Sequence, residues 1–301
     1  YDGGTDLVLA SGSHVLSFAV ENLTLTGSAN ITATGNALDN ILIGNAGNNR
    51  LTGGLGADHM TGGAGHDTYY VDNVGDTVTE GVNAGVDLVQ STVSFVLSDN
   101  IENLYLNGSG DLNGTGNAIN NLITGTVGNN VLDGAGGVDK LFGGLGDDTY
   151  YLDNASDAAK DEADGGQDVV FSSASWVMTA YIEDMTLIGA SNITGTGNAL
   201  ANILMGNSGN NKLDGGTGND SLAGGLGADI FVFGAGSGKD VVTDFTVADL
   251  INVKAYSQGV KNGGGIVISQ AGSDVLIDLG GGNTVTVLDS LKADVVGHMI
   301  W

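Results

Sequence analysis

Carboxylates recur at a fixed spacing in a glycine-rich part of the chain. Residues 53–70, GGLGADHMTGGAGHDTYY, contain one nine-residue phrase twice, and each copy has Asp in sixth place and a large apolar residue in eighth place. Asp in a Gly-rich loop suits tight turns, and carboxylate and carbonyl oxygens are the ligands that hard cations such as Ca²⁺ prefer. The phrase therefore predicts a metal-binding turn that leads into a short buried segment.

The phrase lies within a longer repeat that occurs three times without gaps. Asp67 returns as Asp148 and Asp229 at equal steps, and TGNAL or TGNAI begins at positions 34, 115 and 196 with the same step. We expect solenoid units at 1–81, 82–162 and 163–239, followed by a β-rich ending at 240–301.

Each unit contains consecutive nine-residue rows with an acid or its amide at position six. A period of nine with one apolar residue per row fits neither an amphipathic helix nor a long alternating strand. It fits an all-β fold in which positions seven to nine form a short strand and the glycines turn the chain. Two rows make one coil of a parallel β-solenoid, or β-roll. The position-six residues are Asn40, Asn49, Asp58, Asp67, Asp76, Asn121, Asn130, Asp139, Asp148, Asp157, Asn202, Asn211, Asp220 and Asp229.

The stacking of coils explains why the acids need a cation. Carboxylates in rows i and i+2 fall on one edge of the solenoid, on the order of 4.8 Å apart, and repel each other. A Ca²⁺ ion, which accepts six or more oxygens at about 2.4 Å, reverses that repulsion. Glycine shapes the loop and leaves its carbonyls accessible.

These rows resemble a known family. GGLGADHMT, GGAGHDTYY, GGLGDDTYY, GGTGNDSLA and GGLGADIFV are similar to the haemolysin-type calcium-binding repeats of the repeats-in-toxin proteins, which fold as parallel β-rolls. The resemblance implies half-sites made by the carbonyls at positions two and four with the Asp at six. The implied groups are Gly54, Gly56 and Asp58; Gly63, Gly65 and Asp67; Gly144, Gly146 and Asp148; Gly216, Gly218 and Asp220; and Gly225, Gly227 and Asp229.

Some rows depart from the family pattern. Ala135 replaces the second glycine beside Gly137 and Asp139, where the expected ligand is a backbone atom, so this half-site is retained. In the last row Gly238 stands in place of the acid, although Asp240 lies close. The rows with Asn at position six have only a neutral oxygen and are expected to bind calcium weakly or not at all. We expect roughly six to nine ions, two or three per unit.

Two alternatives stay open at this stage. Gly, Asn and Asp turns also build metal-free solenoids with Asn ladders, but acids recurring in register favour calcium. The segments near VENL (20–23), IENL (101–104) and IEDM (182–185) are either further coils or spacers, and their lack of Gly-Gly-x-Gly turns favours spacers. If instead every row is half a coil, nine rows make four and a half coils, and equivalent sites alternate between opposite edges.

The overall charge excludes several classes of partner. The chain has 35 acidic residues against 8 Lys and Arg, a net charge of −27 and no Cys. Nucleic acid and anionic membranes would be repelled, whereas cations would be attracted. No apolar run is long enough for a transmembrane helix. The first residue is Tyr and no signal peptide is present, so we expect a piece of a longer chain.

The ending, 240–301, lacks the nine-residue loops and resembles the C-terminal region of type I secreted proteins, which carries an uncleaved export signal. A plain cap for the open solenoid end is the simpler interpretation, and both can hold. GAGSGKD (234–240) lacks the first glycine and the Ser or Thr of a phosphate loop, and neither HExxH nor GxSxG occurs.

The sequence therefore predicts a noncatalytic, extracellular calcium-binding module. We expect it to be a structural or adhesive part of a larger exported bacterial protein, with the secretion apparatus, a cell surface or further copies of the chain as partners. The alternative is the noncatalytic tail of a secreted protease, lipase, glycanase or epimerase. A third hypothesis is a metal-free solenoid that binds carbohydrate on its flat face.

Overall fold

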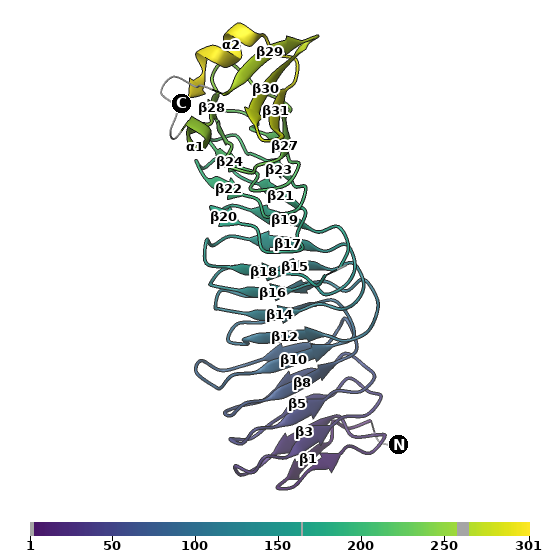
Figure 1. Ribbon diagram of the computed structural model, residues 1–301. Coiled ribbons are helices and arrows are strands. Elements are labelled where there is room, and N and C mark those ends of the chain that lie inside the picture. Colours follow the sequence, from purple (N-terminus) through teal and green to yellow (C-terminus); the bar gives the residue numbers. More distant parts are fainter. Residues whose placement is uncertain (1–2, 164, 258–264) are drawn as a thin grey trace. The chain divides into compact units, whose positions relative to one another are not determined.

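The computed structural model describes residues 3–163, 165–257 and 265–301 and has a parallel β-solenoid fold (Figure 1). The chain forms two compact units. Unit 1 extends to Asp148 and includes Ser156–Ala159, and unit 2 comprises Thr149–Ala155 and Lys160–Trp301. Within the described residues, no helix is long and apolar enough to cross a membrane.

Unit 1 consists of short strands joined by turns. Its strands are β1 (Leu7–Ala10), β2 (His14–Val15), β3 (Asn22–Leu25), β4 (Thr32–Thr34), β5 (Ile41–Ile43), β6 (Arg50–Thr52), β7 (His59–Thr61), β8 (Thr68–Val71), β9 (Thr77–Thr79), β10 (Leu88–Ser91), β11 (Phe95–Val96), β12 (Asn103–Leu106), β13 (Gly114–Thr115), β14 (Leu122–Thr124), β15 (Val131–Asp133), β16 (Lys140–Phe142) and the start of β18 (Ala158–Lys160).

Strands in unit 1 pair with the strand two places along the chain. One sheet has the order β1-β3-β5-β7-β9, and another runs from β2 through the even-numbered strands to β18. β5 pairs with β7 so that Leu42 lies opposite Met60, which holds the same position two rows later. Two nine-residue rows therefore make one coil, as the sequence predicts.

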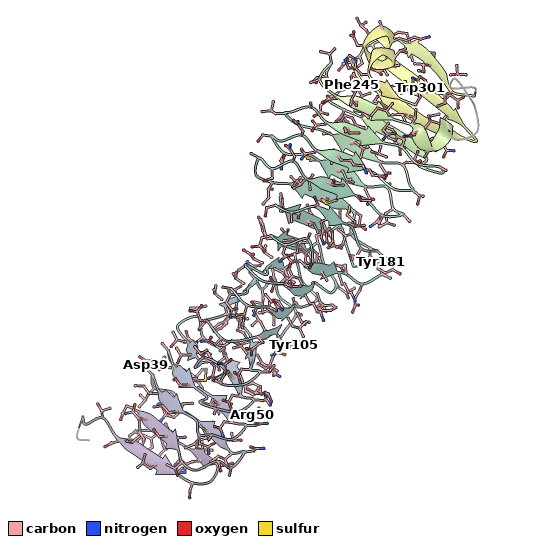
Figure 2. The ribbon with its side chains drawn as sticks, turned by 90° about the vertical axis from the view of Figure 1, so that its left-hand side faces the viewer. Asp39, Arg50, Tyr105, Tyr181, Phe245 and Trp301 are labelled. Carbon is pink, nitrogen blue, oxygen red and sulfur yellow. The ribbon has the colours of Figure 1, made fainter. Side chains whose placement is uncertain are left out.

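The predicted row structure is confirmed. Positions seven to nine form the strands, as in β5, β6 and β7. The eighth side chains, such as Leu42, Leu51, Met60, Tyr69 and Val78, are fully buried and stack into a narrow core. Their neighbours at positions seven and nine point outward, which gives each strand one inward side chain. Arg50 and Tyr105 project from one side of unit 1 and Asp39 from the other (Figure 2).

The segments around VENL and IENL are coils, so the preference for spacers is wrong. β12 pairs with β10 and β14, and Leu104 and Leu106 are buried in the core. Leu104 lies opposite Val89 of the coil before it and Ile123 of the coil after it, so the first of these coils is shorter than two nine-residue rows and the second is longer. These coils keep the strand register while their turns differ in length from those of the regular rows.

Because those segments are coils, equivalent sites alternate between sheets. Asn40 precedes β5, in the sheet of odd-numbered strands, whereas its equivalent in the next repeat, Asn121, precedes β14 in the sheet of even-numbered strands. An odd number of half-coils per repeat explains this alternation, which the four-and-a-half-coil arrangement predicts.

Unit 2 continues the same pattern and ends in a different arrangement. Its elements are β17 (Thr149–Leu152), β19 (Val169–Ser172), β20 (Trp176–Val177), β21 (Asp184–Leu187), β22 (Thr194–Thr196), β23 (Ile203–Met205), β24 (Lys212–Asp214), β25 (Ser221–Ala223), β26 (Ile230–Val232), β27 (Lys239–Val242), β28 (Leu250–Asn252), α1 (Lys254–Ser257), β29 (Val267–Ala271), β30 (Asp274–Gly280), β31 (Asn283–Val287), α2 (Lys292–Gly297) and β32 (Met299–Ile300).

The last strands of unit 2 cap its solenoid. β31 pairs parallel with β27, and β30 and β29 then add antiparallel strands to the same sheet. β32 pairs with β28 at the end of the opposite sheet. The β-rich ending is therefore present, with two short helices beside it, and it covers edges that are otherwise open for pairing.

The glycines at positions two and four have the left-handed backbone that the turn requires. Gly54 and Gly56 have φ angles of 94° and 117°, and every other glycine in the predicted half-sites also has positive φ. A Cβ at Gly56 would lie 2.5 Å from the carbonyl oxygen of Leu38, one coil earlier. The loops therefore stack at a distance that a side chain does not permit.

We predict that Gly56→Ala destabilises the calcium-loaded fold by roughly 2 kcal/mol or more, because both the backbone angle and the loop contact oppose a methyl group. Urea unfolding in saturating calcium measures the loss. Gly12→Ala is the matched control, since a Cβ there has nothing within 4 Å, and it should change the free energy of unfolding by less than about 0.5 kcal/mol. Equal losses in the two variants would contradict this account of the turn.

Candidate metal centre

The position-six carboxylates form a ladder along each edge. Oδ1 of Asp58 accepts a hydrogen bond from the backbone N–H of Asn40 at 2.7 Å, and the backbone N–H of Asp58 donates in turn to Oδ1 of Asp76 at 2.9 Å. Residues 40, 58 and 76, which lie two rows apart, are thus neighbours along one edge of the solenoid, as the sequence predicts. Each acid is fixed by the coil before it and each presents its N–H to the coil after it.

The same contact recurs throughout both units. Further acceptor carboxylates are Asp67 (from Asn49), Asp87 (from Asp67), Asp139 (from Asn121), Asp148 (from Asn130), Asp157 (from Asp139), Asp220 (from Asn202), Asp229 (from Asn211), Asp240 (from Asp220) and Asp249 (from Asp229), at 2.6 to 3.1 Å. Asp240 therefore takes the ladder position that Gly238 does not fill.

In several coils, only one of the two oxygens of the ladder carboxylate accepts a hydrogen bond. Oδ2 of Asp58, Asp67, Asp220, Asp229 and Asp240 is buried and has no hydrogen-bond partner among the described residues. A Cβ on Gly53 would overlap Oδ2 of Asp58, so the absent side chain at position one makes room for this oxygen. A buried carboxylate oxygen without a donor is unfavourable unless a proton or cation reaches it.

Carbonyls at positions two and four of the asparagine rows face the glycines of the predicted half-sites one coil later. The carbonyl oxygens of Asn36 and Leu38, at positions two and four, lie against Gly54 and Gly56 of the next coil. Thr126 and Gly128 have the same relation to Gly144 and Gly146. The edge thus gathers carboxylate and carbonyl oxygens, a donor set that fits a hard divalent cation.

In the asparagine rows, both polar groups of the position-six side chain have hydrogen-bond partners within the protein. Oδ1 of Asn40 accepts from the backbone N–H of Asn36 at 2.7 Å, and its Nδ2 donates to the carbonyls of Val20 and Glu21, one coil earlier. Asn49, Asn121, Asn130, Asn202 and Asn211 are buried and make the same two kinds of hydrogen bond. An amide N–H₂ thus bonds to the carbonyls that a carboxylate, which has no N–H, cannot satisfy.

Burial raises the pKa of several ladder carboxylates. The pKa of Asp58, Asp67 and Asp229 rises from 3.8 to about 6, and that of Asp220 rises to about 7. Desolvation is the largest cause, the backbone hydrogen bond opposes it, and the next carboxylate along the ladder adds repulsion. The charged form is therefore disfavoured in the metal-free fold, which is the electrostatic condition that a cation relieves.

The sequence pattern missed several acids that complete the edges. Asp87 and Asp249 extend the ladder from Asp67 and Asp229 at a spacing of 20 residues, whereas Asp58 follows Asn40 at a spacing of 18. The recurrence of Asp87 as Asp168 in the next repeat is a signal that finds the first of them. Glu80 approaches Asp67 from the longer turn between β9 and β10, and nothing in the nine-residue pattern indicates it.

A second ladder at position five was also missed. Oδ1 of Asp39 accepts from the backbone N–H of Ala57 at 2.8 Å, and Asn48 accepts from the N–H of His66 at 3.0 Å. Oδ1 of four more asparagines accepts a backbone N–H from the coil that follows; these are Asn120, Asn129, Asn210 and Asn219. These exposed bonds hold adjacent loops together without metal, and the frequent Asn and Asp at position five are their sequence signal.

Comparison with protein families matches the repeats directly. The model of the RTX calcium-binding nonapeptide repeat matches this chain in four copies, at residues 34–69, 115–150, 196–231 and 205–242. These ranges contain the predicted glycine loops and most of the position-six residues described above.

Two curated relatives come from Rhizobium meliloti (strain 1021). The chain is 34% identical over 201 residues to the endo-1,3-1,4-beta-glycanase ExsH and 36% identical over 180 residues to the endo-1,3-1,4-beta-glycanase EglC. The alignments cover 65% and 58% of this chain but 42% and 38% of the relatives, so the chain spans about two fifths of their length. A solved structure, the extracellular lipase LipA from Serratia marcescens, aligns with 73% of this chain and 45% of its own at a TM-score of 0.33 and 17% identity.

We predict that Asp58→Asn weakens calcium binding and stabilises the calcium-free fold, because an amide at position 58 can adopt the hydrogen bonds of Asn40. Calorimetry should show at least a tenfold loss of affinity at one site, and circular dichroism in chelator should show more β-structure than in the wild type. Asn40→Ala is the comparison, since it removes a neutral side chain and should affect calcium affinity much less. Equal losses of affinity for Asp58→Asn and Asn40→Ala would show that the rows are not distinguished by charge.

The raised pKa values predict that acid stabilises the calcium-free fold. A folded-state pKa above the unfolded value gives stability that is full below about pH 4 and is lost as the pH rises through 6 to 7, by on the order of 2 kcal/mol per carboxylate. Circular dichroism in calcium-stripped buffer should therefore show more β-structure at pH 5 than at pH 7.5. The difference should shrink in Asp220→Asn, and a β signal that is independent of pH would contradict the burial of ionised carboxylates.

Proposed function

We propose that this chain, which carries RTX calcium-binding nonapeptide repeats, is a β-roll module that folds on binding calcium after export, within a larger secreted bacterial protein. The observation that supports this most is the row of buried carboxylate oxygens without partners among the described residues, at Asp58, Asp67, Asp220, Asp229 and Asp240. The chain has 35 acids and only 8 Lys and Arg, so its own bases cannot neutralise them.

Calcium supplies positive charge at the edges, and the chain supplies the oxygens. In this proposal the acids at positions 58, 67, 139, 148, 220 and 229 bind ions, together with carbonyls at positions two and four of their loops. The acids at 76, 157 and 240 contribute from adjacent coils. Roughly six to nine ions, at six or more oxygens each, would offset a large part of the net charge.

The asparagine coils have a complementary role in the proposal. Because Asn40, Asn49, Asn121, Asn130, Asn202 and Asn211 already bond to their own loop and to the coil before it, these coils need little or no calcium. They would provide metal-independent structure from which the calcium-dependent coils extend. Solenoid stability is close to a sum of coil and neighbour contributions, so folding can spread in this way.

The calcium concentration is low in the cytoplasm and higher outside the cell, so a calcium-dependent fold would form only after export. A highly charged chain that cannot bury its carboxylates stays unfolded and suits passage through a type I secretion apparatus. Outside, millimolar calcium would drive folding, and the strands of the cap at 240–301 would provide an edge on which coils assemble. The module would then act at the cell surface or in the medium, as a structural or adhesive segment.

The relatives favour an enzyme as the parent protein. Both are named endo-1,3-1,4-beta-glycanases, and this chain corresponds to about two fifths of their length. The second candidate function is therefore the noncatalytic, calcium-dependent part of a secreted glycanase. Activity assays of the parent protein with and without this module distinguish that role from adhesion.

We predict that the chain is largely unfolded in EGTA at pH 7.5 and folds at about 0.1–1 mM calcium, the range of extracellular modules. A circular dichroism titration from EGTA into calcium, with magnesium at the same concentrations as control, measures this. Magnesium should be much less effective, because it needs a tighter octahedral site and dehydrates reluctantly. A full β spectrum in EGTA would overturn the proposed function.

A further inference from the structure

Three acids of unit 1 converge where a nine-residue row, which supplies Asp67, meets the longer turn between β9 and β10. Asp67, Glu80 and Asp87 each place a carboxylate oxygen within 4.8 Å of the other two. Asp67 ends a GGxGxD loop, Asp87 occupies the corresponding place one coil later, and Glu80 belongs to the longer turn between β9 and β10. The three oxygens therefore come from two turns: Asp67 ends the loop before β8, and Glu80 and Asp87 begin and end the turn between β9 and β10.

Glu80 stands where the nine-residue rows have glycine. Position one is Gly53 and Gly62 in two earlier rows, whereas the row after Asp76 begins with Glu80. A Cβ on Gly62 would overlap Oδ2 of Asp67, the phenol oxygen of Tyr69 and Oε1 of Glu80. These oxygens thus meet beside Gly62, in space that the absent side chain leaves.

The acids at this turn are buried and incompletely satisfied. Asp67 is 1% exposed and Asp87 is 0% exposed, and Oδ2 of each has no hydrogen-bond partner among the described residues. Their Oδ1 atoms are held by the backbone N–H groups of Asn49 and Asp67, which leaves the Oδ2 atoms for another ligand.

Tyr69 fixes the third carboxylate. It is fully buried in the core, and its hydroxyl donates a hydrogen bond to Oε1 of Glu80. The charged groups around the cluster are Glu102, which accepts from the N–H of Asp87 at 2.8 Å, and His66, which bonds to the backbone of Val86. The three carboxylates of the cluster thus have a fourth carboxylate, Glu102, and one histidine, His66, beside them.

The pairing of a buried tyrosine with an acid recurs in the next repeat. In unit 2 the hydroxyl of Tyr150 donates to Oδ2 of Asp161 at 2.6 Å, and these residues hold the places of Tyr69 and Glu80 in that repeat. In the third repeat the tyrosine is Phe231 and the acid is Val242, so both partners are absent together. Because both partners change together, the tyrosine hydroxyl and the carboxylate form one hydrogen-bonded pair with a shared role.

We propose that Asp67, Glu80 and Asp87 form a divalent-cation site made of side chains, distinct from the loop-carbonyl sites of the nonapeptide rows, with Tyr69 as its positioning residue. The cation class is a hard divalent ion such as Ca²⁺, because every donor is a carboxylate or phenol oxygen. This choice of ion rests on the function proposed above. The site joins the row of residues 62–70 to the turn between β9 and β10.

The competing account is a proton shared between Asp67 and Glu80. Two close carboxyl groups can hold one proton instead of a metal, which also removes the repulsion. The two accounts differ in the number of ions that the chain binds, and so they can be separated by counting.

The test compares the calcium stoichiometry of the full chain with that of Glu80→Gln. The substitution retains an acceptor for Tyr69 and removes one charged ligand. Equilibrium dialysis against calcium at pH 7.5 should show one ion fewer per chain, or one site weakened at least tenfold. Glu21→Gln is the matched control, since it removes the same charge from a side chain that accepts a hydrogen bond from the N–H of Asp6, and it should retain the full number.

The outcomes separate this site from the proposed function. If the wild type and Glu80→Gln bind equal numbers of ions with equal affinity, the side-chain site is wrong even though calcium drives folding. If the wild type binds no calcium at all, the proposed function fails first. Should Glu80→Gln not fold, wild-type crystals soaked in Tb³⁺ decide the matter: an anomalous peak between Asp67 and Glu80 supports the site, and its absence overturns it.

Discussion

Carboxylates stacked one coil apart and shielded from water dominate the energetics of this solenoid. Each ladder acid uses one oxygen to accept an N–H from the coil before it, and several leave the second oxygen buried without a donor among the described residues. The core cannot offset much of this cost, because each row adds only one inward side chain, such as Leu42 or Met60. In the proposed function a cation at the edge removes the cost, and calcium binding and folding would then be thermodynamically one process.

Glycine, asparagine and aspartate have different structural roles in the turns. Glycine allows loops to stack directly on the carbonyls of the previous coil, as Gly56 does on Leu38. Asparagine completes the hydrogen bonds between loops by itself, as Asn40 does with Val20 and Glu21. Aspartate cannot donate, so in the proposed function its coil needs a cation. The order of Asn rows before Asp rows in each repeat would therefore place coils that need no cation beside coils that do.

Much of this arrangement follows from the sequence because a nine-residue period fixes both strand and turn. The buried eighth positions, the coil of two rows and the positive φ of Gly54 and Gly56 are all predictable from spacing. The coil at Leu104 was missed because its turns use other means, such as Asn100 in a left-handed conformation with φ of 65°. Asp87 and Glu80 were missed because a longer turn shifts them out of the nine-residue register.

The most direct test is the dependence of unfolding free energy on calcium concentration at pH 7.5. Each ion that binds only the folded chain adds RT ln(1 + [Ca²⁺]/Kd), so the slope against ln[Ca²⁺] counts the ions taken up on folding. Urea unfolding from about 0.1 to 10 mM calcium gives this slope. The account predicts an uptake of at least four ions, and a slope near zero would show that the buried carboxylates are neutralised without calcium.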